Sequence, residues 1–471
     1  MSSDSGTNPL EGHVQLMASR GAELLNAGRF QEALACFEIV REVCPGDPRL
    51  LLYAGAALHG LGRLEDAVAV YRHALSAAPD YGELHNNLGN SLMASGRFAE
   101  AAECYSRAAA LLPGSPVPVT ANATALQALG RYRESEEKCR AALNIDSGFA
   151  AAHWNLALNL LTRGEYASGW REYEWRWQRA DFTSPRRHLD RPLWDGSPLH
   201  GRTILLHAEQ GLGDVVQFVR YAPMVAGFGG KVLLECHPEL VTLMRSVEGV
   251  TDAMAFDAAA DSDFACHIPL LSLPRVFGTT LETIPSRIPY LSQSAAYTSK
   301  WQNLTALQRS RLKVGLVWAG KSYPDPLRSC PWGEMKALLA INGVSFFSLQ
   351  FGMAGRPGGE RTDAGDGLVD LTGKICDFSD TAALISQLDL IISIDTSVAH
   401  VAGAMGKQTW LLLPYAADWR WLLHRSDSPW YPTMTLFRQQ IPGDWNGLIT
   451  RVKLALISWI RKKSFEEASK D

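Results

Sequence analysis

The chain has 471 residues, of which 46% are apolar and 20% charged, and its formal net charge is -4. These values are ordinary for a globular protein of two or three domains, and they predict no basic surface for nucleic acid. The eight cysteines form no Cys-x-x-Cys pair, which argues against a zinc site or a disulfide framework. The N-terminus is polar, and no apolar run approaches about 20 residues. We therefore expect a cytoplasmic protein without a membrane span.

The first part of the chain repeats with a period of 34 residues. Glycines mark the repeats at Gly28, Gly62, Gly96, Gly130 and Gly164. Five positions later stands a small residue: Ala33, Ala67, Ala101, Ser135 or Gly169. Four positions further on stands a larger packing residue: Phe37, Tyr71, Tyr105, Cys139 or Tyr173. The pattern resembles the tetratricopeptide (TPR) repeat, in which paired helices cross at a small residue. We expect residues 12–182 to form an all-α superhelix of five repeats whose groove binds a protein.

The fifth repeat carries more aromatic residues than a solvent-facing helix needs. They are Trp170, Tyr173, Trp175 and Trp177. We predict that this helix packs against the next domain; the alternative is a capping helix covered only by the following linker. Three prolines within residues 183–200 predict that linker.

After residue 200, short apolar runs alternate with helical segments. The predicted strands are 203–208, 231–236, 253–256 and 264–268 in a first series, then 313–318, 344–349, 368–371, 390–394 and 409–413 in a second. The predicted helices are 214–226, 239–246, 332–341, 381–388 and 398–405. This alternation is typical of α/β folds with parallel sheets covered on both faces. A polar stretch at 293–310 separates the series, so we predict two Rossmann-like lobes over 201–300 and 301–463. The second lobe ends in a helix, and residues 464–471 form a charged tail.

A first candidate site follows the strand 203–208. Gly211 and Gly213 let the backbone approach a ligand closely, and Asp214 lies at the start of the next helix, which favours a negative group. The alternative is that Asp214 only caps that helix and the glycines make a tight turn. The segment lacks the third glycine of a dinucleotide-binding loop and the Gly-Lys-Ser/Thr of a P-loop.

A second candidate site follows the strand 390–394. Thr396 and Ser397 offer hydroxyls and backbone amides at a helix start, which suits a diphosphate. His400 lies one turn beyond Thr396, so both can face one anion. The alternatives are a buried core histidine at 400 and a helix-capping role for Asp395.

Three further residues follow strands of the second series. Lys321 and Arg328 lie in a loop after the strand 313–318, where a lysine and an arginine can hold phosphate; the alternative is solvated surface charge. Gln350 follows the strand 344–349 and is a weaker candidate for a base or ribose contact. The segment 418–432 is rich in tryptophan and charge. It either lines a sugar or nucleotide pocket or packs between lobes or onto the repeats.

Taken together, the second half resembles GT-B glycosyltransferases of the heptosyltransferase-like group. Those enzymes carry Gly-Asp at the first helix and Asp-Thr-Gly-x-x-His in the second lobe, and Gly213-Asp214 and Asp395-Thr396-Ser397-x-x-His400 match them in place. Ser397 departs from the family's glycine, and the first lobe is short. The whole chain resembles bacterial TPR glycosyltransferases, which include enzymes that glycosylate flagellin, and it is similar in layout to O-linked N-acetylglucosamine transferases.

The resemblance implies an inverting, metal-independent transfer of a sugar to a protein serine or threonine. Asp214 is then the general base, and Gly211, Gly213, Asp395, Thr396, Ser397 and His400 surround the donor, with Gln350 beside it and Lys321 and Arg328 neutralising the leaving group. The donor is a nucleotide sugar and no other cofactor is expected. The acceptor is a protein in the TPR groove, for which flagellin is one candidate.

Two other functions fit the same residues. One is a scaffold or chaperone whose transferase-like half has lost its activity, which the departure at Ser397 and the short first lobe would explain. The other is a transferase that acts on a glycan, with the repeats serving as an assembly platform.

Overall fold

The protein is described from a computed structural model covering residues 9–469, except 45, 189, 257, 259–262, 294, 306–311, 322–325 and 351–366. It divides into two compact units, residues 1–159 and 160–471. Among the described residues, no helix is both long and apolar enough to cross a bilayer.

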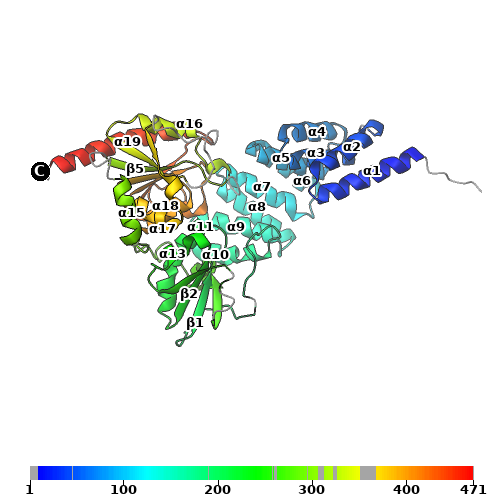
Figure 1. Ribbon diagram of the computed structural model, residues 1–471. Helices are drawn as coiled ribbons and strands as arrows, with labels where there is room; N and C mark the ends of the chain where they lie inside the picture. The colour runs from blue at the N-terminus through cyan, green and yellow to red at the C-terminus, as the bar shows by residue number, and fades with distance from the viewer. Residues whose placement is uncertain are drawn as a thin grey trace, which may run out of the picture. The chain divides into compact units, whose positions relative to one another are not determined.

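The first unit consists of antiparallel helix pairs stacked in chain order (Figure 1). They are α1 (Pro9–Asn26), α2 (Phe30–Val43), α3 (Pro48–Gly60), α4 (Leu64–Ala77), α5 (Gly82–Ala94), α6 (Phe98–Leu111), α7 (Pro116–Ala128), α8 (Tyr132–Ile145) and the start of α9 (Ala150–Thr162). The predicted periodicity is confirmed, since a helix ends just before each glycine of the 34-residue series and another begins just after it. The predicted repeat helices therefore form as expected.

The repeating glycines are required by backbone geometry. Gly62 has φ +74°, a conformation that other residues rarely adopt. Its N–H donates to the carbonyl of His59 (2.9 Å), and the N–H of Arg63 donates to that of Leu58 (2.9 Å). These paired bonds end helix α3 and turn the chain into α4. The other four glycines of the series also have positive φ.

Small residues allow the helices of a pair to approach closely. Ala67 is fully buried where α4 crosses α3. The Tyr71 ring lies against Gly55, where an added Cβ would come within 2.4 Å of it. Phe37 covers Gly21 and Tyr105 covers Gly89 in the same way. The large packing residue of each of these repeats therefore fills the space that a glycine on the preceding helix leaves.

The fifth repeat is split between the two units. Its second helix, α10 (Tyr166–Tyr173), and the 3₁₀ helix η1 (Glu174–Gln178) belong to the unit that contains the sheets. The sequence boundary at 182 therefore differs from the structural one at 159. The reason is the aromatic face of α10, on which Trp170 is 1% exposed and packs edge-on against Trp419 (ring centroids 5.2 Å). The packing predicted for the aromatic run is confirmed.

The second unit contains two parallel sheets. The first sheet has the order β3-β2-β1-β4, with β1 (Thr203–His207), β2 (Lys231–Cys236), β3 (Val250–Ala255) and β4 (Cys266–Pro269). The predicted helix 214–226 is divided into α11 (Leu212–Phe218), η2 (Val219–Tyr221) and α12 (Ala222–Ala226), because Pro223 starts a new helix there. Shorter helices follow: η3 (Pro238–Leu240), α13 (Val241–Met244), η5 (Leu270–Ser272) and α14 (Leu273–Val276).

The second sheet has the order β10-β9-β8-β5-β6-β7 and is parallel throughout. Its strands are β5 (Leu312–Val317), β6 (Val344–Ser348), β7 (Leu368–Asp370), β8 (Leu390–Ile394), β9 (Thr409–Leu413) and β10 (Met434–Arg438). Numbered from β5, this is the 3-2-1-4-5-6 arrangement of doubly wound sheets, in which the chain switches direction between the first and fourth strands. Here the switch point lies between β5 and β8.

Helices cover both faces of the second sheet, as its apolar strands predicted (Figure 1). Residues of α16 (Trp332–Met335), η8 (Lys336–Ala340) and α19 (Trp445–Ala468) form one core with the strands. The opposite face carries α17 (Phe378–Ser386) and α18 (Ser397–Ala404), which are buried over most of their length. Shorter 3₁₀ segments are η7 (Pro326–Arg328), η10 (Thr372–Lys374) and η11 (Trp419–Trp421).

Three elements differ from the sequence prediction. The polar stretch at 293–310 contains helix α15 (Ala295–Thr305), anchored by Trp301, whose Nε1 donates to Asp380 (3.0 Å). The strand β10 lacks a long apolar run and was not predicted. The charged tail is helical as far as Ala468, and Lys463 pairs with Glu466 (3.1 Å) in the last turns of α19.

Candidate functional site

The carboxyl ends of β1, β5 and β8 each lead into one of the predicted site segments. Parallel strands place their carboxyl ends at one edge, where α/β proteins bind ligands. Helix α11 from the first sheet packs against α18 from the second. Their contact is close at Gly213, where an added Cβ would come within 2.9 Å of His400 Cδ2 and 3.6 Å of Ser397 Cα. The structure therefore brings the first and second candidate sites together.

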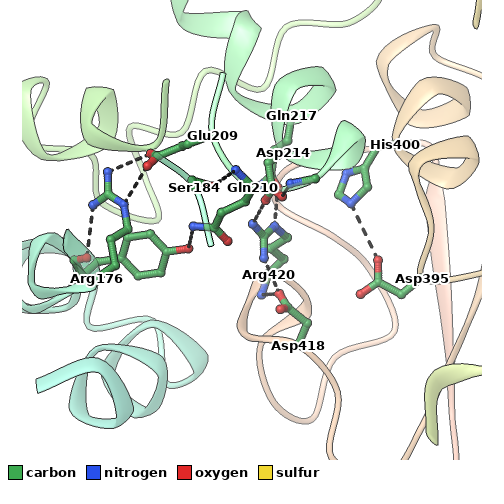
Figure 2. A network of polar contacts seen from close by, with 12 residues as sticks. Arg176, Ser184, Glu209, Gln210, Asp214, Gln217, Asp395, His400, Asp418 and Arg420 are labelled. Atoms are coloured by element: carbon green, nitrogen blue, oxygen red, sulfur yellow. Dashed lines mark hydrogen bonds and ion pairs between the residues drawn. The ribbon is translucent and has the colours of Figure 1, made fainter. Parts of the chain in front are cut away.

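Each carboxylate oxygen of Asp214 accepts a hydrogen bond from the protein, and the side chain is 15% exposed. Its Oδ2 accepts the N–H of Gly211 (2.8 Å), which caps α11. Its Oδ1 accepts a hydrogen bond from Arg420, as Figure 2 shows. The predicted cap is thus present, and the remaining oxygen forms an ion pair that links the two sheets. A hydroxyl that approaches Asp214 would have to share or displace one of these bonds.

Arg420 is the centre of the polar network and was not predicted as a site residue. Its guanidinium donates to Asp214, to Asp418 (2.9 Å) and to the Gln217 side chain (2.6 Å). Its side chain is 9% exposed and lies over the Trp419 ring, 4.3 Å from the centroid. Burial by itself would lower the pKa of Arg420, but the two carboxylates raise it, so the residue stays cationic. The only signal in the sequence was an arginine between two tryptophans.

The tryptophan-rich segment 418–432 packs rather than lining an open pocket. Trp419, Trp421 and Trp430 are each at most 3% exposed. Trp421 Nε1 donates to Asp395 Oδ2 (2.8 Å), which connects the segment to the end of β8. Of the two interpretations given above, packing is the one that these contacts support.

His400 is a buried histidine whose ring nitrogens both have partners. Its Nδ1 lies 2.7 Å from the Tyr431 hydroxyl, and its Nε2 lies 3.7 Å from Asp395 Oδ1. Although burial alone would raise the pKa of Asp395, the His400 ring and Trp421 hold that pKa below its ordinary value. This agrees with the alternative given above, a core histidine. His400 thus lies between Tyr431 and Asp395, and its ring also packs against Gly213.

Thr396 and Ser397 remain partly exposed at the start of α18. Thr396 is the residue that precedes the helix, and its hydroxyl lies 3.2 Å from the Ser393 hydroxyl. Its backbone carbonyl accepts from Ala399 and His400, as a helix start requires. The earlier amides of α18 point outward from the helix end, which is the arrangement that binds anions.

Gln350 supports the loop after β5 and is 3% exposed. Its Oε1 accepts the N–H groups of Trp318 (3.2 Å) and Ala319 (2.9 Å), and its Nε2 donates to the carbonyl of Ala319 (2.8 Å). Both ends of the amide are therefore engaged by the backbone instead of being presented to a base or ribose. Its role is to fix the backbone at the switch point.

Lys321 and Arg328 lie at the same edge. Lys321 is exposed, and Arg328 folds over Gly320, donating to the carbonyl of Lys321 (3.2 Å). The Arg328 Nε has no hydrogen-bond partner among the described residues. Burial lowers the pKa of His237, at the end of β2, and the charge of Lys321 contributes.

A second buried ion pair lies at the switch point of the first sheet. Arg176 of η1 donates to both oxygens of Glu209 (2.7 and 3.1 Å) and to the Ser272 hydroxyl (2.8 Å). Glu209 follows β1 and Ser272 follows β4, so the guanidinium connects the segments that follow these two strands; Figure 2 shows its contact with Glu209. The sequence feature that could have indicated this pair is Arg176 between two tryptophans, but the sequence does not show that its partner is Glu209.

The predicted linker at 183–200 is irregular but is held to the first sheet. Trp194 is 4% exposed, and its N–H donates to the His267 carbonyl (2.9 Å). His188 lies 3.0 Å from the buried Glu235. Within the described ranges, no group of three or more histidine, cysteine or acidic side chains is arranged to hold a metal ion.

Comparison with known proteins identifies the repeats. Residues 19–82 and 61–116 match the model of the tetratricopeptide repeat. The chain is 27% identical over 356 residues to protein FlbA of Caulobacter vibrioides, a match that covers 68% of this chain and 57% of FlbA. The match is longer than the repeat array, so it must extend into the parallel-sheet region. The chain spans little more than half the length of this relative.

Solved structures similar to the chain cover about a third of it. They include MamA from Desulfovibrio magneticus (19% identity, 35% of this chain and 92% of that chain, TM-score 0.31). Another is a thermophilic TPR protein of Thermus thermophilus (20% identity, 36% and 91%, TM-score 0.32). Scores this low carry no weight for the chain as a whole. The chain carries TPR repeats and continues into a parallel-sheet α/β region.

Proposed function

We propose that the protein is a GT-B-type glycosyltransferase that moves a sugar from a nucleotide donor to a protein hydroxyl. The observation that supports this most is the packing of α11 on α18, which joins the ligand-binding edges of two parallel sheets. Asp214 comes from one sheet, and Thr396 and Ser397 come from the other. A two-sheet arrangement of this kind can hold a donor on one side and an acceptor on the other.

The second sheet is the proposed donor side. Its switch point combines the start of α18 with Lys321 and Arg328, and Arg328 keeps an N–H unpaired within the described residues. Backbone amides and two cations suit the diphosphate of a nucleotide sugar. They would stabilise the negative charge that develops on the leaving group, which allows a metal-independent reaction.

Asp214 is the proposed general base, and the reaction is proposed to be inverting. The carboxylate would accept the proton of the acceptor hydroxyl while the leaving group is held by the opposite sheet. The contact with Arg420 must loosen for this to happen. The TPR array would recruit the protein acceptor, with flagellin as one candidate, and we place the reaction in the cytoplasm.

A non-catalytic scaffold is the second candidate, and the Asp214 contacts favour it. A carboxylate with both oxygens occupied, and a histidine with both nitrogens engaged, are what a purely structural core would also contain. A transferase that acts on a glycan stays a third possibility.

The first experiment is thermal unfolding with UDP, GDP, ADP and CMP at millimolar concentration. A ligand at 100 times its Kd stabilises by about 2.7 kcal/mol, which is a measurable shift. We expect one nucleotide to stabilise the protein, and Lys321→Ala to reduce that shift while Lys231→Ala, an exposed lysine on β2, leaves it unchanged. No shift with any nucleotide would favour the scaffold.

The second experiment measures transfer. Asp214→Asn should abolish sugar transfer to a co-expressed acceptor protein, read by mass spectrometry, while nucleotide binding persists. Asp377→Asn, which alters the capping aspartate of α17, is the control and should keep full transfer. Retained transfer by Asp214→Asn would remove Asp214 from the mechanism.

A further inference from the structure

The loop that leads from β1 to Asp214 is held by the last TPR repeat. Arg176 binds the Glu209 carboxylate, and the Tyr173 hydroxyl accepts from Gln210 Nε2 (3.0 Å). The Gln210 N–H donates to the Ser184 hydroxyl (2.8 Å) just beyond η1. Consecutive loop residues are thus each tied to the segment 173–184, as Figure 2 shows.

The same helix also supports the other partner of the ion pair. The Tyr166 hydroxyl accepts from Trp430 Nε1 (3.0 Å), and their rings stack at 6.0 Å. Trp170 packs edge-on against Trp419, the residue before Arg420. Helix α10 therefore contacts the segment that carries Arg420 as well as the loop that carries Asp214.

Backbone strain shows that the loop is not in its preferred conformation. Gln210 has φ +60°, which is in the left-handed region that residues with a side chain rarely adopt. Such a residue persists only where its surroundings hold it in place, and strain of this kind is concentrated at functional sites. The contacts from Tyr173 and Ser184 are the ones that hold Gln210.

We infer that α10 and η1 form a positioning element, which fixes the geometry of the Asp214–Arg420 pair from both sides. Tyr173 and Arg176 act as positioning residues, because each reaches the pair only through another residue. As far as it concerns catalysis, this inference rests on the proposed function, in which Asp214 is the base. The fifth TPR repeat is then part of the site and not only part of the docking array.

The repeat supplies a matched control for the test. Tyr105 stands at the same repeat position as Tyr173, is equally buried, and donates its hydroxyl to Asn90 (2.8 Å). Tyr173→Phe and Tyr105→Phe thus each remove one buried hydroxyl from equivalent places. Both variants should fold, and both should lower the melting temperature slightly and to a similar extent.

Hydrogen exchange of the full chain separates the two variants. We expect Tyr173→Phe to speed exchange of the Gln210 and Gly211 amides about fivefold, the effect of losing one hydrogen bond, because those amides depend on Ser184 and Asp214. Tyr105→Phe should leave exchange at 208–218 unchanged. Arg176→Lys keeps the positive charge but loses the two-bonded contact with Glu209. It should speed the exchange of the same amides as Tyr173→Phe does.

Turnover gives a second measurement where the protein transfers a sugar. Tyr173→Phe should lower kcat several-fold without changing KM for the donor, whereas Tyr105→Phe should change neither. If the wild-type protein shows no transfer, the proposed function fails, but the exchange result still decides whether the loop is held by the repeat. Equal exchange at 208–218 in both tyrosine variants would overturn the inference.

Discussion

Removal of Arg176 should destabilise the second unit strongly. In Arg176→Met the Glu209 carboxylate stays buried without its partner, since Arg176 is fully buried and Glu209 side-chain exposure is only 1%. Breaking a buried ion pair on one side costs about 3–5 kcal/mol. Because the substitution also removes the hydrogen bonds to Ser272 and to the Tyr173 carbonyl, we expect a cost toward the upper end of this range.

Urea unfolding followed by tryptophan fluorescence is the appropriate assay. Every tryptophan except Trp154 lies in residues 160–471, so the signal reports on the second unit. Arg425→Met is the control, because Arg425 lies in the same unit and makes the same two-bonded contact with Asp427 (2.6 and 2.9 Å) while a third of its side chain is exposed. It should leave the transition unchanged. An equal effect of Arg176→Met and Arg425→Met would refute the reasoning.

The pH dependence of the same variant checks the cause. Burial already raises the pKa of Glu209, and Arg176 opposes that rise. Without Arg176 the pKa should rise further. A carboxyl whose pKa is raised in the folded state contributes most to protein stability at low pH, where it is protonated. That contribution is lost as the pH increases through the raised pKa. The loss of unfolding free energy in Arg176→Met, relative to the wild type, should therefore be larger at pH 8 than at pH 5. The double variant Arg176→Met/Glu209→Gln should remove this difference.

Three further substitutions test separate parts of the structure. Gly213→Ala should cost about 1–3 kcal/mol in urea unfolding, since its Cβ would press on the His400 ring, while Gly333→Ala, with open space around it, should cost little. Gln350→Glu should weaken nucleotide binding in the thermal-shift assay, because it loses the donor to the Ala319 carbonyl. Burial lowers the pKa of both His207 and His267, so the unfolded chain binds more protons and stability should fall as pH drops below about 6.5; His207→Gln should flatten this fall in urea unfolding at pH 5.5 and 7.5.

Periodic features of the fold could be predicted from the sequence. The glycine at each 34-residue step follows from the positive φ of a helix end, and strands such as β2, β8 and β9 have the predicted bounds because each is a mostly apolar run between polar breaks. Helix α15 and strand β10 could not be predicted in this way. Helix α15 is held by the buried residue Trp301. A single buried residue produces no repeating apolar pattern, so the sequence gives no periodic signal for this helix.

The position of the candidate site in the fold could be predicted from the sequence, but the contacts of its side chains could not. Strand ends located Asp214, Asp395 and the loop at Lys321, because parallel strands put their carboxyl ends on one edge. Sequence does not give the partner of a polar side chain when that partner is as distant along the chain as Arg420 is from Asp214. For the same reason, the contacts of Gln350 with the backbone of Trp318 and Ala319 and of His400 with Tyr431 were not predicted.

The Asp214–Arg420 pair explains why stability alone cannot separate an enzyme from a scaffold. Replacing all members of a buried ion-pair network by uncharged residues is often neutral or stabilising, so Asp214→Leu/Arg420→Met/Asp418→Asn, which leaves no carboxylate without its partner, should fold under either function. If the protein is a scaffold, the variant should bind its partner through the repeats as the wild-type protein does. A transferase would lose turnover, because its proposed general base is gone. The two functions therefore differ only in what the folded triple variant can catalyse.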